Sequence, residues 1–231
     1  LAPMDANSQS SRAISQPMQH ALDLAAQAMR ITSPNPRVGC VIVNAQGQVI
    51  GQGHTQRAGG HHAEIMALQD AAHQGHSVEG ATAYVTLEPC AHHGKTGPCC
   101  DALIQAKVGK VVAALTDPNP HVAGQGFERL RAAGIEVQVG DGADPAAAQN
   151  PGFLSRMTHQ KPWVRLKIAA SLDGQTSLTN GKSQWITGPE ARADGHAWRA
   201  RACAVLTGIG TVLEDDPLLD LRLCANLAIF A

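Results

Sequence analysis

The segment AYVTLEPCAHHGKTGPCCDALIQAK, residues 83–107, decides the fold of this chain. Its apolar start, Ala83–Leu87, is typical of a buried strand, and the polar, glycine-containing loop 88–97 follows it. Pro98 then fits the first turn of a helix, where a residue without a backbone donor is tolerated. The segment therefore predicts a strand, a loop and a helix in succession, with a Pro-Cys pair at each end of the loop.

Elements of the same two kinds flank this segment on both sides. Apolar residues at helical spacing predict helices, and short apolar runs between turn residues predict strands. A hairpin followed by alternating helices and strands predicts an α/β domain of three layers, α/β/α, in which helices cover both faces of a mixed sheet. The elements are expected at Pro17–Ile31 (helix), Val38–Val43 and Gln48–Gly53 (strands), His62–Ala72 (helix), Ala83–Leu87 (strand), 98–107 (helix), Val108–Leu115 (strand), Gly126–Ala133 (helix) and Ile135–Val139 (strand).

The strongest boundary signal in the chain is the turn-rich stretch Gly140–Pro145. We therefore expect a polar, disordered leader over 1–16, a first domain over 17–145, a connecting helix within 146–160, and a second unit over 161–231. The pattern places the connecting helix at Ala146–Met157, and in the second unit it predicts a strand at Trp163–Ala170, a helix at Pro189–Ala202 and a strand at Ala204–Thr207.

The composition is that of an ordinary globular protein and argues against several classes of function. Of 231 residues, 44% are apolar, and the formal net charge of −1 leaves no broad basic surface for nucleic acid. The sequence has no run of 18 apolar residues, so it predicts no transmembrane helix. Residues 1–16 lack the apolar centre of a secretory signal. We expect a cytoplasmic protein with a small-molecule substrate and no nucleic-acid or membrane partner, and the sequence leaves a homo-oligomer open.

The cysteines and one histidine predict a zinc site. Three of the six cysteines fall within eleven residues, beside several histidines, which favours a metal over disulfides. His62, Cys90 and Cys99 offer the nitrogen and sulfur ligands of zinc, and a catalytic zinc site keeps its fourth position for water. Cys100 competes with Cys99 as the third ligand; we favour a small buried residue as the role of Cys100.

Glu64 is the predicted catalytic residue. It lies two residues after His62, close enough to reach the water of a zinc site without being a ligand. Two thiolates cancel the charge of Zn²⁺, so the metal acidifies its water less than in a three-histidine site, and a nearby base is useful. Glu64 would take the water proton, protonate a ring nitrogen and help the amine to depart. These residues therefore predict a zinc-dependent hydrolytic deaminase that acts on a pyrimidine-type ring.

Several longer motifs carry a family resemblance. The wide spacing of the two cysteines in TLEPCAHHGKTGPCCDALI resembles the bifunctional deaminase/reductases of riboflavin biosynthesis, as do PNPRVGCVIV at 34–43, HAEIMAL at 62–68 and DPNPHVAGQG at 117–126. The resemblance implies a cytidine-deaminase-like domain that deaminates 2,5-diamino-6-(5-phosphoribosylamino)pyrimidin-4-one. It implies that His62, Cys90 and Cys99 bind Zn²⁺, that Glu64 moves the proton, that Asn35 contacts the substrate, and that Lys95 is either a phosphate contact or a solvated lysine.

The second unit resembles the start of the same family's reductase domain, which has a dihydrofolate-reductase-like α/β fold and uses NADPH. The match rests on KIAASLDGQTSL at 167–178, SQWITGPEAR at 183–192 and GTVLEDDPLLDLR at 210–222. It implies NADPH contacts from Ala169, Trp185, Thr211 and Asp215, and contacts to the phosphorylated substrate from Ser183, Arg199, Leu219 and Arg222. The closing run LCANLAIFA does not resemble the family's continuation, so we expect a truncated reductase domain whose activity is lost or impaired.

Two alternatives remain open. The first is a deaminase of free cytidine, guanine or a tRNA adenosine, against which the long loop between the cysteines, the reductase-like tail and the near-neutral charge all argue. The second is a structural zinc module, which would need a fourth protein ligand, such as Cys100 or His93, in place of water.

Overall fold

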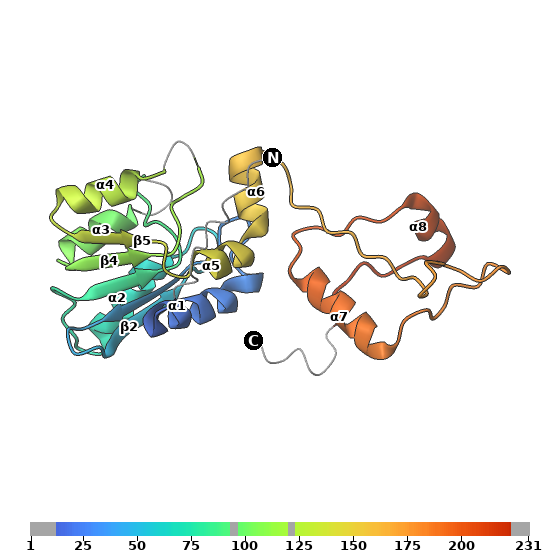
Figure 1. Cartoon of the computed structure of the whole chain (residues 1–231), viewed down its shortest axis with the longest axis horizontal. Helices are drawn as coiled ribbons and strands as arrows, with labels where there is room; N and C mark the ends of the chain where they lie inside the picture. The colour runs from blue at the N-terminus through green and yellow to red at the C-terminus, as the bar shows by residue number, and fades with distance from the viewer. Residues whose placement is uncertain (1–12, 93–96, 120–122, 223–231) are drawn as a thin grey trace, which may run out of the picture. The chain divides into compact units, whose positions relative to one another are not determined.

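The computed structural model describes residues 13–92, 97–119 and 123–222, which form two compact units that divide between Lys161 and Pro162 (Figure 1). In the first unit the helices and strands follow the predicted order, with ends within a few residues of those expected. They are α1 Gln16–Gln27, the 3-10 turn η1 Ala28–Arg30, β1 Gly39–Val43, β2 Val49–His54, α2 Ala63–His73, β3 Thr82–Val85, α3 Cys99–Gln105, β4 Lys110–Ala113, α4 Gln125–Ala132, β5 Glu136–Val139, α5 Ala143–Gln149 and α6 Pro151–His159.

The sheet of the first unit has five strands in the order β2-β1-β3-β4-β5. β1 pairs antiparallel with β2 and β3, whereas β3, β4 and β5 run parallel, which confirms the predicted mixed sheet. Because β3 and β4 are parallel and in register, the loops that follow them begin at the same edge of the sheet. Those loops carry Cys90 and Asp117, so this edge is where functional groups can converge.

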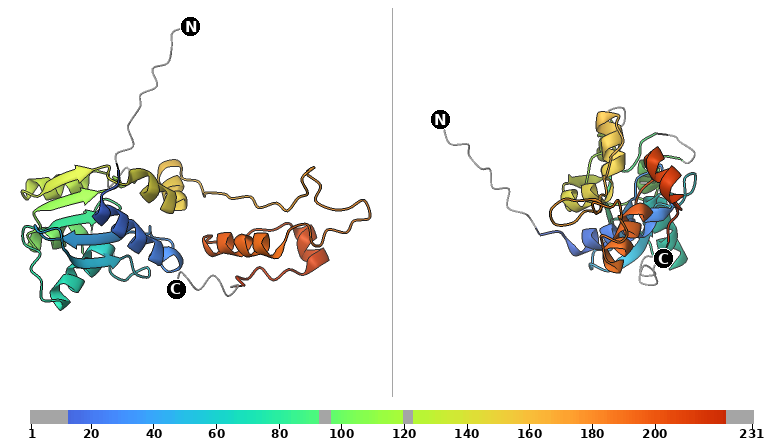
Figure 2. Two further views of the ribbon diagram at one scale, coloured as in Figure 1. Left: turned by 60° about the horizontal axis from the view of Figure 1, so that its bottom comes forward. Right: turned by 90° about the vertical axis from the view of Figure 1, so that its right-hand side faces the viewer.

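Helices lie on both faces of the sheet, as a three-layer domain requires (Figures 1 and 2). Each face has its own hydrophobic core. Along β1, Cys40 and Ile42 pack with residues of α2, α3 and α4, whereas Val41 and Val43 pack with residues of α1 and with Ala146 of α5. The alternation follows from the two-residue period of a strand. Cys40 is fully buried, as its apolar neighbours predict, and burial raises the pKa of its thiol well above the usual range.

A close approach between β2 and α2 fixes the helix that carries the candidate base. A Cβ atom on Gly53 would lie 2.4 Å from Cβ of Met66 and 2.9 Å from the carbonyl oxygen of Ala63. Only glycine therefore lets the first turns of α2 lie this close to the strand. The backbone on either side of Glu64 is held directly against the sheet.

The segment after β5 differs from the sequence expectation. The pattern predicts one helix over Ala146–Met157, but the structure has two, α5 and α6, with a break at Asn150 (φ −124°, ψ 38°). The break arises because Pro151 disfavours a helical conformation for the residue before it. At the other end of the unit, Ser15, assigned from sequence to the leader, is the N-cap of α1, and its hydroxyl accepts a hydrogen bond from the amide of Met18.

In the second unit the structure has two helices, α7 Pro189–Ala200 and α8 Ile209–Asp215. The strands predicted at 163–170 and 204–207 are wrong: within residues 162–222 no backbone ladder forms. A strand needs a partner backbone, and here the apolar side chains of Trp163, Val164 and Leu166 remain exposed rather than packed. Across the described parts of both units, no helix combines the length and apolarity needed to cross a membrane.

Candidate active site

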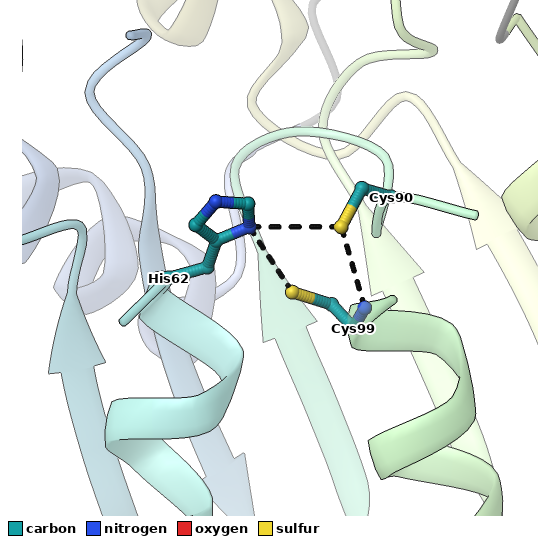
Figure 3. Close-up of side chains that lie close together, drawn as sticks. All are labelled: His62, Cys90 and Cys99. Carbon is teal, nitrogen blue, oxygen red and sulfur yellow. Dashed lines mark hydrogen bonds between the residues drawn. The ribbon is translucent and has the colours of Figure 1, made fainter. Parts of the chain in front are cut away.

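His62, Cys90 and Cys99 meet at the edge of the sheet, as predicted. His62 Nδ1 lies 3.2 Å from Cys99 Sγ and 3.6 Å from Cys90 Sγ, and the three candidate ligand atoms all lie within 4.8 Å of one another (Figure 3). Among the described residues, no fourth His, Cys, Asp or Glu joins this cluster. Such a set leaves a fourth tetrahedral position for water.

Local backbone structure brings the three side chains together. His62 is the extended N-cap of α2, and Cys99 is the first residue of α3, where Pro98 is the cap. Cys90 lies in the loop after β3 and is tied to the start of α3 by two bonds: the amide of Cys99 donates to Cys90 Sγ (3.3 Å), and the amide of Cys100 donates to the Cys90 carbonyl (3.2 Å). Helix N-termini carry partial positive charge, which favours thiolate over thiol.

The two thiols share their protons unequally in the absence of metal. The hydrogen bond from the Cys99 thiol is the main cause that lowers the pKa of Cys90, to about 4, and the same contact together with burial raises the pKa of Cys99. The hydrogen bond with Cys90 raises the pKa of His62. The pair therefore loses one proton easily and holds the other, and a divalent cation supplies the charge needed to make both sulfurs thiolates. The donor set fits Zn²⁺.

Cys100 does not point into the cluster. It is fully buried in the core beside α2 and α4, and its Sγ lies 3.7 Å from Asp101 Oδ1. Burial raises the pKa of its thiol to about 11. Its position is that of a small core residue, whereas Cys99, one residue earlier on α3, faces His62.

Glu64 lies in the first turn of α2 with only 4% of its surface exposed. Burial is the largest cause that raises the pKa of its carboxyl to about 7, and the charge of Cys90 adds to this effect. A carboxyl group with a pKa near neutrality can both accept and return a proton at physiological pH. Glu64 lies beside the cluster, where it shares a side-chain hydrogen bond with Cys99 and where the charges of His62 and Cys90 act on its pKa.

The two substrate contacts predicted in the first unit are Asn35 and Lys95. Asn35 is half-buried in the loop before β1, where its backbone N–H donates to the carbonyl of Thr32 (2.7 Å). Lys95 and His93 lie outside the described residues.

Two acidic residues that the sequence analysis did not identify lie near the cluster. Glu88 is buried, and the pKa of Asp117 is raised mainly by burial and also by the charges of Glu88 and Cys90. The sequence signal for both is their position in the loops that follow β3 and β4.

In the second unit the structure brings Arg199 and Arg222 together. Arg199 Nη1 donates to the carbonyl of Asp220 (3.2 Å), and the amide of Arg222 lies 3.3 Å from Nδ1 of His196, both contacts joining α7 to the segment after α8. Trp185 is exposed and lies under the guanidinium of Arg192, 4.6 Å from the ring centre. Ala169 is half-buried, and the remaining predicted contacts are exposed, namely Ser183, Thr211, Asp215 and Leu219.

Family models match both units. The cytidine and deoxycytidylate deaminase zinc-binding region matches residues 11–115, and the RibD C-terminal domain matches residues 162–226. These matches support the predicted fold of each part, a cytidine-deaminase-like domain followed by the start of a reductase-like domain, and they support Zn²⁺ as the cofactor of the first.

Whole-chain comparisons agree with the family models. The riboflavin biosynthesis protein RibD of Escherichia coli is 54% identical over 205 residues, covering 89% of this chain and 55% of its own length, and that of Aquifex aeolicus is 46% identical over 89% of this chain and 56% of its own. A structure of Acinetobacter baumannii RibD superposes with a TM-score of 0.85 at 52% identity, over 92% of this chain and 59% of its own. A diaminohydroxyphosphoribosylaminopyrimidine deaminase/5-amino-6-(5-phosphoribosylamino)uracil reductase from Thermotoga maritima superposes with a TM-score of 0.84 at 42% identity, over 90% of this chain and 59% of its own. The chain thus spans little more than half the length of these relatives.

Proposed function

Since this chain belongs to the RibD family of riboflavin biosynthesis proteins, we propose that its first unit is a zinc-dependent hydrolase that deaminates 2,5-diamino-6-(5-phosphoribosylamino)pyrimidin-4-one. The observation that carries the proposal is the placement of the buried Glu64 beside the cluster of His62, Cys90 and Cys99. That pairing combines a site for a Lewis acid with a proton carrier of near-neutral pKa.

In this proposal, His62, Cys90 and Cys99 hold the metal, and Zn²⁺ when bound keeps both sulfurs as thiolates and lowers the pKa of the attacking water. Glu64 accepts the proton of that water and transfers it to a nitrogen of the pyrimidine ring. As the carbon–oxygen bond forms, Glu64 accepts the second proton of the attacking water, now a hydroxyl proton, and passes it to the exocyclic amine. The carbon–nitrogen bond then breaks, ammonia leaves, and the carbonyl group of the product forms. Burial keeps bulk water from competing for that proton.

A small phosphorylated pyrimidine fits the family, with Asn35 as a contact and Lys95, outside the described residues, as a phosphate partner. Ser183, Arg199, Leu219 and Arg222 remain proposed contacts for the phosphorylated substrate of the reductase step, and Ala169, Trp185, Thr211 and Asp215 remain proposed contacts for NADPH. A cytoplasmic location and self-association stay predictions.

An ammonia-release assay tests the deaminase proposal. The purified chain is offered the phosphorylated diaminopyrimidinone, cytidine and guanine in parallel, and its zinc content is measured. We expect ammonia only from the first substrate, loss of release after chelation, and recovery when Zn²⁺ is returned. Release from cytidine or guanine instead would favour the free-base alternative, and zinc-loaded protein without any release would favour a structural zinc module.

A further inference from the structure

Glu88 is a buried carboxylate that binds three backbone amides of one segment. Its Oε2 accepts from the amides of Asp117 (2.9 Å) and Gly124 (3.0 Å), and its Oε1 accepts from the amide of Gly126 (2.9 Å). Only 4% of the residue is exposed. Three amides on one carboxylate compensate for taking its charge out of water, and they lock the side chain in one orientation.

Two of these amides belong to the N-terminus of α4. Gly124 is the N-cap of that helix, has a left-handed conformation (φ 82°), and offers no side chain to cap it. Glu88 therefore caps α4 from another part of the chain, satisfying amides that would otherwise lack partners and placing negative charge at the positive end of the helix. The contact is tight: a Cβ atom on Gly126 would lie 2.1 Å from the carbonyl oxygen of Pro89.

The same helix also holds the chain on the other side of Cys90. Arg129, one turn further along α4, donates from Nη1 to the carbonyl of Ala91 (3.2 Å). Its Nε also pairs at 2.9 Å with Asp101, which lies two residues after Cys99 on α3. Residues 88 and 91 are thus both fastened to α4, and Arg129 further links α4 to the helix that begins with Cys99.

We propose that Glu88 is a positioning residue of the metal centre. Together with Arg129 it fixes residues 88–91, the Cys90 loop, against α4, and it thereby keeps Cys90 Sγ beside His62 and Cys99, the other two proposed ligands. The inference rests on the proposed zinc site and adds to it residues that touch neither metal nor substrate. Groups that orient metal ligands in this indirect way commonly change metal affinity by about 10- to 100-fold when removed.

The test is the rate at which zinc-loaded protein gives up its metal to a chromogenic chelator. Glu88→Gln keeps the shape of the side chain but replaces one acceptor oxygen with an NH₂ group, which faces amide donors that it cannot bind. We expect release about 10-fold faster or more. The matched control is Glu128→Gln, which removes the same charge from an exposed position in the first turn of α4 and leaves the rate unchanged.

A second control separates positioning from general loss of stability. Val41→Ala weakens the core on the opposite face of the sheet, away from α4, so it lowers the free energy of unfolding without touching the Cys90 loop. At a temperature where all variants are folded by circular dichroism, Val41→Ala should release zinc at the wild-type rate. If Val41→Ala and Glu88→Gln accelerate release equally for equal losses of stability, the positioning role is refuted.

Arg129→Gln provides an independent variant should Glu88→Gln not fold. It removes the bond to the Ala91 carbonyl and the pair with Asp101, and it is expected to accelerate release as well. Wild-type release rates in a folded Glu88→Gln or Arg129→Gln protein would overturn the inference while leaving the proposed function standing. Wild-type protein that binds no zinc would instead refute the proposed function.

Discussion

Asn150 binds both polar backbone groups of Arg37, 113 residues earlier in the chain. Its Oδ1 accepts from the Arg37 amide (2.8 Å), and its Nδ2 donates to the Arg37 carbonyl (2.9 Å). Asn150 is the residue at the break between α5 and α6, so that break places a polar side chain in a buried position against the loop before β1. Asn35, the proposed substrate contact, lies two residues upstream in the same loop.

Replacing Asn150 should therefore weaken both stability and substrate binding. Asn150→Ala leaves the backbone groups of Arg37 without these partners, and we expect a loss of about 1–3 kcal/mol in the free energy of unfolding. Because the loop that carries Asn35 loses its support, KM should rise more than kcat falls. Urea unfolding and steady-state kinetics measure the two effects. Asn150→Asp, which keeps the acceptor, should lie between wild type and alanine, and unchanged values in Asn150→Ala would contradict the role of the pair.

Glu64→Gln tests the proposed proton carrier. The amide fits the same buried space but cannot accept the water proton, so deamination should fall by at least about 10²- to 10⁴-fold. Zinc content and the circular dichroism spectrum should stay those of the wild type, since Glu64 is not a proposed ligand. Ammonia release at a near-normal rate in the zinc-loaded variant would rule out Glu64 as the base.

Variants of the adjacent residues Cys99 and Cys100 test which of the two cysteines is the third zinc ligand. Cys99 faces His62 at 3.2 Å, whereas Cys100 is buried in the core behind it. Cys99→Ser should lose zinc, and Cys100→Ser should retain most of it, with a modest loss of stability from the changed core side chain. Metal analysis of the two purified proteins decides between them, and the reverse pattern would show that the register is off by one residue.

The clustering of His62, Cys90 and Cys99 could be predicted because each residue lies at a predictable junction between elements. Cys90 follows a strand, Cys99 starts a helix behind a proline, and His62 precedes another helix, so each position could be inferred from local pattern alone. Glu88 shows the limit of such inference. Its three partners are 29, 36 and 38 residues away, and no local periodicity indicates that a loop will fold back over a strand end.

The strand predictions for the second unit are wrong for a related reason. An alternation of apolar residues at 163–170 predicts a strand, but strands depend on backbone partners that local sequence does not specify. The described residues 162–222 form no ladder, and α8 was missed because glycines at 208 and 210 flank its start and lower its helical propensity. α7, whose proline lies at the first turn, was predicted correctly to within two residues at its end.

The raised pKa of Glu64 predicts a pH dependence of the zinc-free protein. Burial raises the pKa of this carboxyl from 4.5 to about 7, so the folded state binds the proton more tightly than the unfolded state. The resulting stabilisation is fully present below pH 4.5 and is lost as the pH rises towards 7, with a total change of up to about 3 kcal/mol. Urea unfolding of wild type and Glu64→Gln between pH 4.5 and 8 measures it. As the pH rises, the free energy of unfolding of the wild type should fall relative to that of Glu64→Gln. A difference in free energy of unfolding that stays constant with pH would contradict the raised pKa.

NADPH oxidation by this 231-residue chain is expected to be negligible, even if its deaminase is active. In α/β domains a dinucleotide binds across the carboxyl ends of several adjacent strands, with its phosphates near backbone amides of the following loops. The described residues 162–222 have two helices and no strand, and Trp185, Thr211 and Asp215 are exposed. The test supplies the deaminated intermediate with NADPH and follows the loss of absorbance, while a parallel ammonia assay of the first step confirms that the protein is folded and active. Robust NADPH consumption would contradict the prediction.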